Sequence, residues 1–230
     1  ARIVAFHKEK KAAATLVLVP VSDVSAYGVV ETDEDGRVRR FLEKPKPGET
    51  HCNTINAGCY ILEPSILDYV PEGETYSFEY QVFPQILAAG ERIYSYVWND
   101  YWLDIGTPER YLQAHYDLIN DKLPTHPVYR YKAVTGSQAE ARIDDVSVID
   151  PTCVIKPGAE IINSVLGPNC IVEEKARIEN SVLWAASRIG KEAVVTGSVI
   201  GKSGIVGRNS TVNNTFLGDK SSLTDYTLIG

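Results

Sequence analysis

Two segments in the N-terminal half combine an adaptable backbone with a charge suited to a phosphorylated ligand. In residues 26–30, Ala-Tyr-Gly-Val-Val, Gly28 stands where a loop meets an expected strand and lets the backbone approach a ligand closely. In residues 41–45, Phe-Leu-Glu-Lys-Pro, Lys44 stands at an expected strand end and offers a point charge for phosphate. Both features are compatible with a phosphorylated ligand.

Two further segments offer polar atoms for the rest of such a ligand. Residues 56–60, Asn-Ala-Gly-Cys-Tyr, present an amide and bare backbone suited to sugar hydroxyls. In residues 102–108, Trp-Leu-Asp-Ile-Gly-Thr-Pro, Asp104 precedes a tight turn, where a carboxylate could hold Mg²⁺ beside phosphates. Singly, each segment has an ordinary explanation: a strand-entry glycine, a solvated lysine, a strand-capping asparagine or an aspartate bound to turn amides. The chemical hypothesis therefore depends on all four.

The elements that must position these segments alternate between helix and strand, which predicts an α/β fold for residues 1–121. The apolar run at 13–21 is typical of a buried strand, and the acidic turn at 33–36 predicts a hairpin. Thr107 is an expected N-cap followed by proline and an acid. Helices are expected at 1–11, 77–89 and 107–121, and strands at 13–21, 27–32, 37–42, 56–62 and 93–98.

The C-terminal part repeats with a period of 17 residues. Three columns of residues 17 apart are aliphatic at all fifteen positions, and spacings of six, six and five give each coil three sides. An ordinary β-sandwich would not explain so strict a register. The columns are Ile149, Leu166, Leu183, Ile200 and Leu217; Ile155, Val172, Ile189, Val206 and Leu223; and Ile161, Ile178, Val195, Val212 and Ile229.

A small residue, for example Ser147 or Ala159, stands two positions before each of these aliphatic residues. Because residues two apart on a strand face the same side, each side of the coil points one large and one small residue inward. This predicts a triangular β-helix of about five coils at 144–230, joined through a proline-containing linker at 122–143. The open last coil predicts that more chain follows it, or that a second copy in a homo-oligomer or another partner covers it.

In this order and spacing, the four segments resemble the sugar nucleotidyltransferases, also called nucleotide-sugar pyrophosphorylases. The family pattern reads Y-G-V-V, E-K-P, N-A-G-x-Y and W-x-D-x-G-T-P. The resemblance implies that residues 1–121 are the C-terminal part of a Rossmann-like catalytic domain. It also implies that the hexapeptide-repeat β-helix is left-handed. The stretch at 53–60, with Phe83-Pro84, looks closest to mannose-1-phosphate guanylyltransferases, and glucose-1-phosphate uridylyl- or thymidylyltransferases are close alternatives.

The resemblance also implies a reaction and its residues. A sugar-1-phosphate oxygen would attack the α-phosphorus of a nucleoside triphosphate and expel pyrophosphate. Lys44 would hold and orient the sugar phosphate, and Asp104 would be one of two aspartates binding catalytic Mg²⁺. The other substrate-binding residues would be Tyr27, Gly28, Glu43, Asn56, Ala57 and Gly58, with Glu43 on sugar hydroxyls.

The chain departs from the family pattern at one place. The glycine-rich nucleotide-binding loop, G-G-x-G-T-R-L, and the second metal-binding aspartate are absent. The sequence also lacks methionine and begins inside an expected helix, so we expect a fragment or processed chain that carries the sugar-phosphate half of the site and is inactive alone.

Composition limits the other possibilities. The net charge of −7 disfavours nucleic-acid binding, and without a long apolar run or a leader we expect a cytoplasmic protein with no membrane partner. The four cysteines lack zinc-ligand spacing. Acyl transfer, common among β-helix proteins, is disfavoured because all four histidines precede the β-helix. A non-catalytic sugar-phosphate-binding subunit stays open as an alternative.

Overall fold

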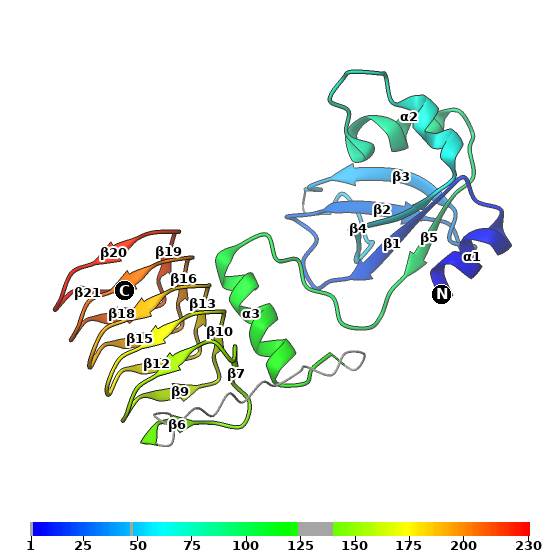
Figure 1. Ribbon diagram of the computed structural model, residues 1–230. Coiled ribbons are helices and arrows are strands. Elements are labelled where there is room, and N and C mark those ends of the chain that lie inside the picture. Colours follow the sequence, from blue (N-terminus) through cyan, green and yellow to red (C-terminus); the bar gives the residue numbers. More distant parts are fainter. Residues whose placement is uncertain (1, 47, 124–139) are drawn as a thin grey trace. The chain divides into compact units, whose positions relative to one another are not determined.

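The computed structural model describes residues 2–46, 48–123 and 140–230. Two compact units make up the chain, Ala1–Trp102 and Leu103–Gly230 (Figure 1). Each contains its own apolar core. Among the described residues, no helix is long and apolar enough to cross a membrane.

The first unit contains the predicted five-stranded sheet, with the strand order β3-β2-β4-β1-β5. β1 and β5 are parallel, whereas the other neighbouring strands are antiparallel. The predicted hairpin is confirmed, since β2 and β3 pair across the turn at 33–36. The strands are β1 (Ala14–Pro20), β2 (Gly28–Thr32), β3 (Val38–Glu43), β4 (Thr54–Leu62) and β5 (Ile93–Val97).

Helices pack on both faces of this sheet. On one face, Phe83 and Ile86 of α2 (Phe83–Ala88) are fully buried in one cluster with Leu16 and Leu18 of β1. On the other face, Phe6 of α1 (Arg2–Lys10) contacts the rings of Tyr94 and Tyr96 on β5. Those tyrosines alternate along the strand with Ile93, which belongs to the first cluster.

The helix predicted at 77–89 consists of two pieces. A π-helical turn, Phe78–Val82, runs directly into α2, and a separate 3₁₀ helix spans Pro64–Tyr69. Ser77 begins the π-helical turn by accepting a hydrogen bond from the Tyr80 N–H at 3.2 Å. The spacing of apolar residues did not predict this π-helical turn, because it does not indicate the extra residue per turn.

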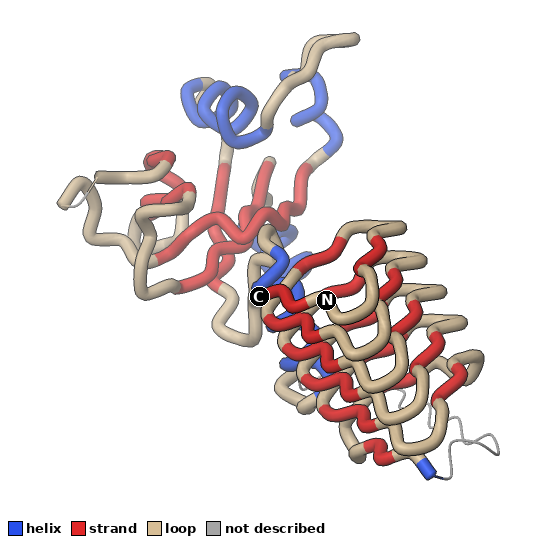
Figure 2. The backbone as a smooth tube through the Cα atoms, turned by 90° about the vertical axis from the view of Figure 1, so that its left-hand side faces the viewer, coloured by secondary structure: helices blue, strands red, loops and turns tan. Residues whose placement is uncertain are grey.

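The second unit confirms the predicted coil (Figure 2). The parallel pairs from β7 to β21 join residues 17 apart, for example Ile178 with Ile161 and with Val195, whereas β6 pairs with β9 at a separation of 18. The aliphatic columns are buried in the first four coils, whereas Leu217 and Leu223 are partly buried and Ile229 is 36% exposed in the last. The architecture is a parallel β-helix of about five coils, consistent with a left-handed one.

Three sheets form the sides of the β-helix. The third side has a sixth strand, β6, which pairs with β9 although it lies within the predicted linker. The first side comprises β7 (Val148–Ile149), β10 (Val165–Leu166), β13 (Val182–Leu183), β16 (Val199–Ile200) and β19 (Phe216–Leu217). The second comprises β8 (Val154–Ile155), β11 (Ile171–Val172), β14 (Arg188–Ile189), β17 (Ile205–Val206) and β20 (Ser222–Leu223). The third comprises β6 (Arg142–Ile143), β9 (Glu160–Ile162), β12 (Arg177–Glu179), β15 (Val194–Thr196), β18 (Thr211–Asn213) and β21 (Leu228–Ile229).

The small inward residues have a second role besides fitting the corners. The Ser181 hydroxyl donates to the Glu179 carbonyl at 2.7 Å and accepts from the Ser198 N–H at 3.1 Å. The same pattern links Ser147 to Ser164, and Ser198 to Thr215. These side chains therefore satisfy backbone groups that the corners would otherwise leave unpaired inside the prism.

Helix α3 (Pro108–Ile119) packs against the first side of the β-helix. That side is apolar on its outer surface too, with a valine or phenylalanine in every coil, and outward-facing Val182 is only 3% exposed. The Tyr111 and Trp184 ring centroids lie 6.2 Å apart, and the Tyr116 hydroxyl donates to the Asn180 carbonyl. Helix α3 therefore belongs to the second compact unit, although the sequence analysis included it in the segment 1–121. The boundaries given there for the catalytic segment stay a prediction.

Candidate active site

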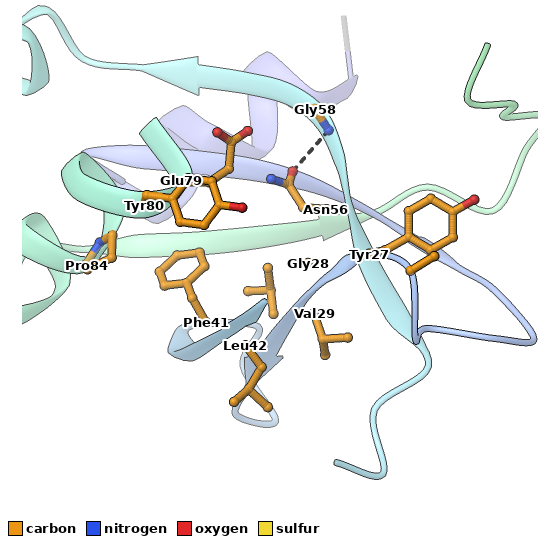
Figure 3. A pocket seen from close by; sticks show the side chains of 12 residues that line it. Tyr27, Gly28, Val29, Phe41, Leu42, Asn56, Gly58, Glu79, Tyr80 and Pro84 are labelled. Atoms are coloured by element: carbon orange, nitrogen blue, oxygen red, sulfur yellow. Dashed lines mark hydrogen bonds between the residues drawn. The ribbon is translucent and has the colours of Figure 1, made fainter. Parts of the chain in front are cut away.

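A pocket of about 480 Å³ opens in the first unit beside three strands of the sheet (Figure 3). Its walls come from the hairpin of β2 and β3, from β4, and from the π-helical turn with the start of α2, so three regions of the sequence form one cavity. The lining residues are Ala26, Tyr27, Gly28, Val29, Val30, Phe41, Leu42, Asn56, Gly58, Glu79, Tyr80 and Pro84. Its volume is in the range of small-molecule sites.

A series of hydrogen bonds fixes the polar wall of this pocket. The Asn56 Nδ2 group donates to the Tyr60 hydroxyl at 2.7 Å, and that hydroxyl donates to Glu79 Oε1 at 2.7 Å. Ser77 holds the other carboxylate oxygen at 3.1 Å, and the Gly58 N–H donates to Asn56 Oδ1 at 3.0 Å (Figure 3). Asn56 and Glu79 are therefore held in defined orientations by Tyr60, Ser77 and Gly58.

The pKa shifts of Tyr60 and Glu79 keep the phenol as the donor and the carboxylate as the acceptor. Desolvation, and then the hydrogen bond to Glu79, raise the pKa of Tyr60 well above its ordinary value. Desolvation would also raise the pKa of Glu79, but hydrogen bonds from Tyr60, from its own backbone N–H and from Ser77 outweigh it and lower that pKa. At neutral pH the phenol is protonated and the carboxylate ionised, so the wall offers an amide donor and a carboxylate acceptor to a ligand.

Of the predicted sugar-binding residues, the structure brings Tyr27, Gly28, Asn56 and Gly58 together around the pocket. Gly58 has a φ of +72°, a left-handed conformation that favours glycine there. Ala57 does not line the cavity, because successive β4 residues face opposite sides of the sheet and Ala57 packs on the cluster of Val19, Val29 and Ile55.

The predicted phosphate-binding segment contributes Phe41 and Leu42 to this pocket, but Lys44 is not among the lining residues. The Lys44 N–H donates to the Tyr27 carbonyl at 3.1 Å, and the Lys44 side chain is exposed. No ion pair links its ammonium to a side chain that the structure describes. Glu43 ends β3 opposite Gly28, and its side chain lies outside the described part of the chain. The side-chain roles assigned to these two residues stay predictions.

Asp104 belongs to the second unit, just before α3. Its Oδ1 atom accepts the Gly106 N–H at 3.1 Å, and its Oδ2 atom lies 3.9 Å from Arg110 Nη1. The carboxylate is half exposed and could give a metal ion one oxygen. The described residues contain no group of three or more His, Cys, Asp or Glu side chains that could hold a metal by themselves.

Sequence reasoning missed several residues of the pocket. Tyr60, Phe41 and Pro84 belong to stretches that the sequence analysis quoted but were assigned no binding role, and nothing in the sequence singles out Tyr80. Glu79 is the most important omission, and its signal was available: it is an acid in the first turn after the N-cap Ser77. The π-helical turn then directs its carboxylate to β4, which the sequence did not indicate.

Comparisons with known proteins cover both units. Residues 1–121 match the family model described as "Nucleotidyl transferase", and residues 125–229 match "EIF2B subunit epsilon LbH domain". A mannose-1-phosphate guanylyltransferase of Mycobacterium tuberculosis is 38% identical over 162 residues, which cover 70% of this chain and 43% of that protein.

Two other relatives are named for different substrates. A UTP–glucose-1-phosphate uridylyltransferase of Synechocystis is 34% identical and covers 70% of this chain and 49% of that protein. A glucose-1-phosphate adenylyltransferase of Clostridium novyi is 34% identical and covers 54% of this chain and 34% of that protein. The chain spans less than half the length of each of these three relatives.

Proposed function

Because the chain belongs to the nucleotidyl transferase family, we propose that its first unit provides the sugar-1-phosphate pocket of an enzyme that makes a nucleotide sugar and pyrophosphate. The single observation that carries this proposal is the Asn56–Tyr60–Glu79 series on the pocket wall. A fixed amide donor and a fixed carboxylate acceptor match the donor and acceptor character of sugar hydroxyls.

The reaction needs little more from the protein than positioning and charge. A phosphate oxygen of the sugar-1-phosphate forms a bond to the α-phosphorus of a nucleoside triphosphate, and the bond to the pyrophosphate leaving group breaks. In this proposal Lys44, next to Tyr27 at the pocket edge, contributes charge to the sugar phosphate. When bound, Mg²⁺ would neutralise phosphate charge, and Asp104 would supply one of its oxygen ligands.

We assign mannose-1-phosphate and a guanine nucleotide as the preferred substrates. The name of the M. tuberculosis relative supports this choice. Glucose-1-phosphate with a uridine nucleotide is the alternative, supported by the name of the Synechocystis relative, which covers the same share of the chain. The two sugars differ only in the configuration of one hydroxyl, so the pocket wall must decide between them.

Calorimetric titration of the 230-residue chain tests the pocket directly. We expect mannose-1-phosphate to bind, and Tyr60→Phe to weaken binding about tenfold, because Asn56 and Glu79 lose the hydroxyl that orients both. Tyr94→Phe, on the opposite sheet face, is the matched control and should leave affinity unchanged. Absence of binding by either sugar phosphate, or equal affinities for both tyrosine variants, would refute the proposed site.

Turnover provides a second test. We expect the chain alone to release no pyrophosphate from nucleoside triphosphates, since it lacks the family's glycine-rich loop. In a catalytically active protein that contains this chain, Asp104→Asn should lower turnover by orders of magnitude; activity near that of the unaltered protein would remove Asp104 from the metal site.

A further inference from the structure

A second pocket, of about 690 Å³, lies within the second unit beside α3. It is lined by one carboxylate, three polar neutral side chains, two apolar side chains, a tyrosine and a glycine, and contains no lysine, arginine or histidine among its described lining residues. These are Glu109, Leu112, Tyr116, Asn180, Thr196, Gly197, Asn214 and Phe216. Nothing in the proposed reaction uses this cavity.

A relay of asparagine amides leads to this pocket along one corner of the β-helix. Asn120 Nδ2 donates to the Tyr116 carbonyl at 2.8 Å and to Asn163 Oδ1 at 2.9 Å. Asn163 Nδ2 in turn donates to Asn180 Oδ1 at 2.7 Å. Because the first acceptor is a carbonyl, the orientation of every amide in the relay is fixed. The Asn180 Nδ2 group is therefore the last donor of the relay.

The relay stops at Gly197, the next residue of this corner column. Positions 163, 180, 197 and 214 all have left-handed φ values, between 44° and 55°, and three of them are asparagine. Gly197 has no side chain to accept a hydrogen bond from Asn180, and Asn180 Nδ2 has no acceptor among the described residues. On the far side of the gap, a Cβ at Gly197 would clash with Asn214 Oδ1, so that acceptor faces the same gap.

We infer that this pocket binds a neutral hydroxylated ligand, a hexose or its glycoside, with one hydroxyl placed in the gap at Gly197. A hydroxyl can accept from Asn180 Nδ2 and donate to Asn214 Oδ1, which completes the interrupted column. The Glu109 carboxylate is a further acceptor for sugar hydroxyls, and Leu112 and Phe216 offer apolar surface to the ring carbons. A carboxylate without a nearby lining cation disfavours a phosphorylated sugar.

The test uses the 230-residue chain labelled with ¹⁵N and titrated with D-mannose and D-glucose. Shifts of the Gly197 backbone resonance and the Asn180 side-chain amide report on this pocket and not on the sugar-phosphate pocket. Two isosteric variants form a matched pair: Asn180→Asp loses the donor, whereas Asn214→Asp keeps the acceptor and adds the same charge. The carboxylate introduced by Asn180→Asp can still accept from Asn163 Nδ2, so the relay above it is retained.

We expect saturable shifts at Gly197 with at least one hexose. We also expect about tenfold weaker binding in Asn180→Asp, the loss of one hydrogen bond, and a change below about threefold in Asn214→Asp. Mannose-1-phosphate should bind this pocket more weakly than mannose. The inference is overturned if neither sugar shifts Gly197, which would leave only water in the gap, if the two variants behave alike, or if the phosphorylated sugar binds as tightly.

Discussion

The two units of this chain build their cores in opposite ways. In the sheet unit, Ala14 pairs with Leu62 on one side and Ile93 on the other, so neighbouring strands come from distant parts of the sequence. In the β-helix, the strands from β7 onward pair with residues one 17-residue period away. Convergence of distant segments produces a pocket with varied walls, whereas repetition produces a regular scaffold. The difference explains why the pocket proposed for a sugar phosphate lies in the first unit and the repetitive array in the second.

The largest expected effect comes from breaking the repeat in its middle. Ile178 is fully buried in a central coil, so Ile178→Asp places a carboxylate in the apolar prism and should destabilise the β-helix by about 5 kcal/mol or more. Ile229→Asp, at a 36% exposed position of the same column, should cost less than about 1 kcal/mol. Urea unfolding followed by circular dichroism measures both, and equal losses would contradict a cooperative array.

The sheet unit should unfold independently of the β-helix when a side chain of its own core is truncated. Phe83 is fully buried and its ring lies 5.7 Å from Phe41 and 4.9 Å from Tyr60. Phe83→Ala should destabilise this unit by about 3–5 kcal/mol and weaken sugar-phosphate binding through Tyr60. Leu67→Ala, at a 59% exposed position, is the control. Hydrogen exchange should show β-helix amides still protected; loss of protection in both units would show that they unfold together.

A smaller loss should follow from removing one hydroxyl of the serine column. Ser181→Ala deprives the buried Ser198 N–H of its acceptor, so we expect a loss of about 1–2 kcal/mol in the free energy of unfolding. Ser222→Ala, on an exposed strand position, should change it by less than about 0.5 kcal/mol. No difference between the two would mean that the column serves only to fit the corner.

The smallest expected effect depends on pH. Desolvation would raise the pKa of Glu173, but Lys156 and Arg188 outweigh it and hold that pKa below its ordinary value of 4.5. The ionised carboxylate therefore stabilises the folded β-helix above pH 4.5, and this contribution is lost as the pH falls through the lowered pKa. The loss in the free energy of unfolding between pH 7 and pH 3 should be about 1 kcal/mol smaller in Glu173→Gln than in the unaltered chain. An equal loss in both proteins would argue against a stabilising role for the ion pairs of Glu173 with Lys156 and Arg188.

Much of the fold could be predicted because the relevant signals are local. The period of 17, the hairpin turn at 33–36 and the N-cap Thr107 each depend on residues close in sequence or on a fixed repeat. The strand order of the sheet could not be predicted in this way, since nothing in the sequence of β1 specifies β4 and β5 as its neighbours.

For the candidate site, too, local sequence predicted some features and the structure was needed for the others. The residue types of the four segments indicated a phosphorylated sugar, and four of the predicted residues line one pocket. The sequence marks Glu79 only as an acid in the first turn after Ser77; its place on the pocket wall required the structure, because it reaches Tyr60 through a π-helical turn. The sequence by itself determined the repeating scaffold and the chemical character of the loops, since both depend on residue identity at short or periodic spacing. Only the tertiary structure decided which side chains share a cavity, because long-range strand pairing brings them together.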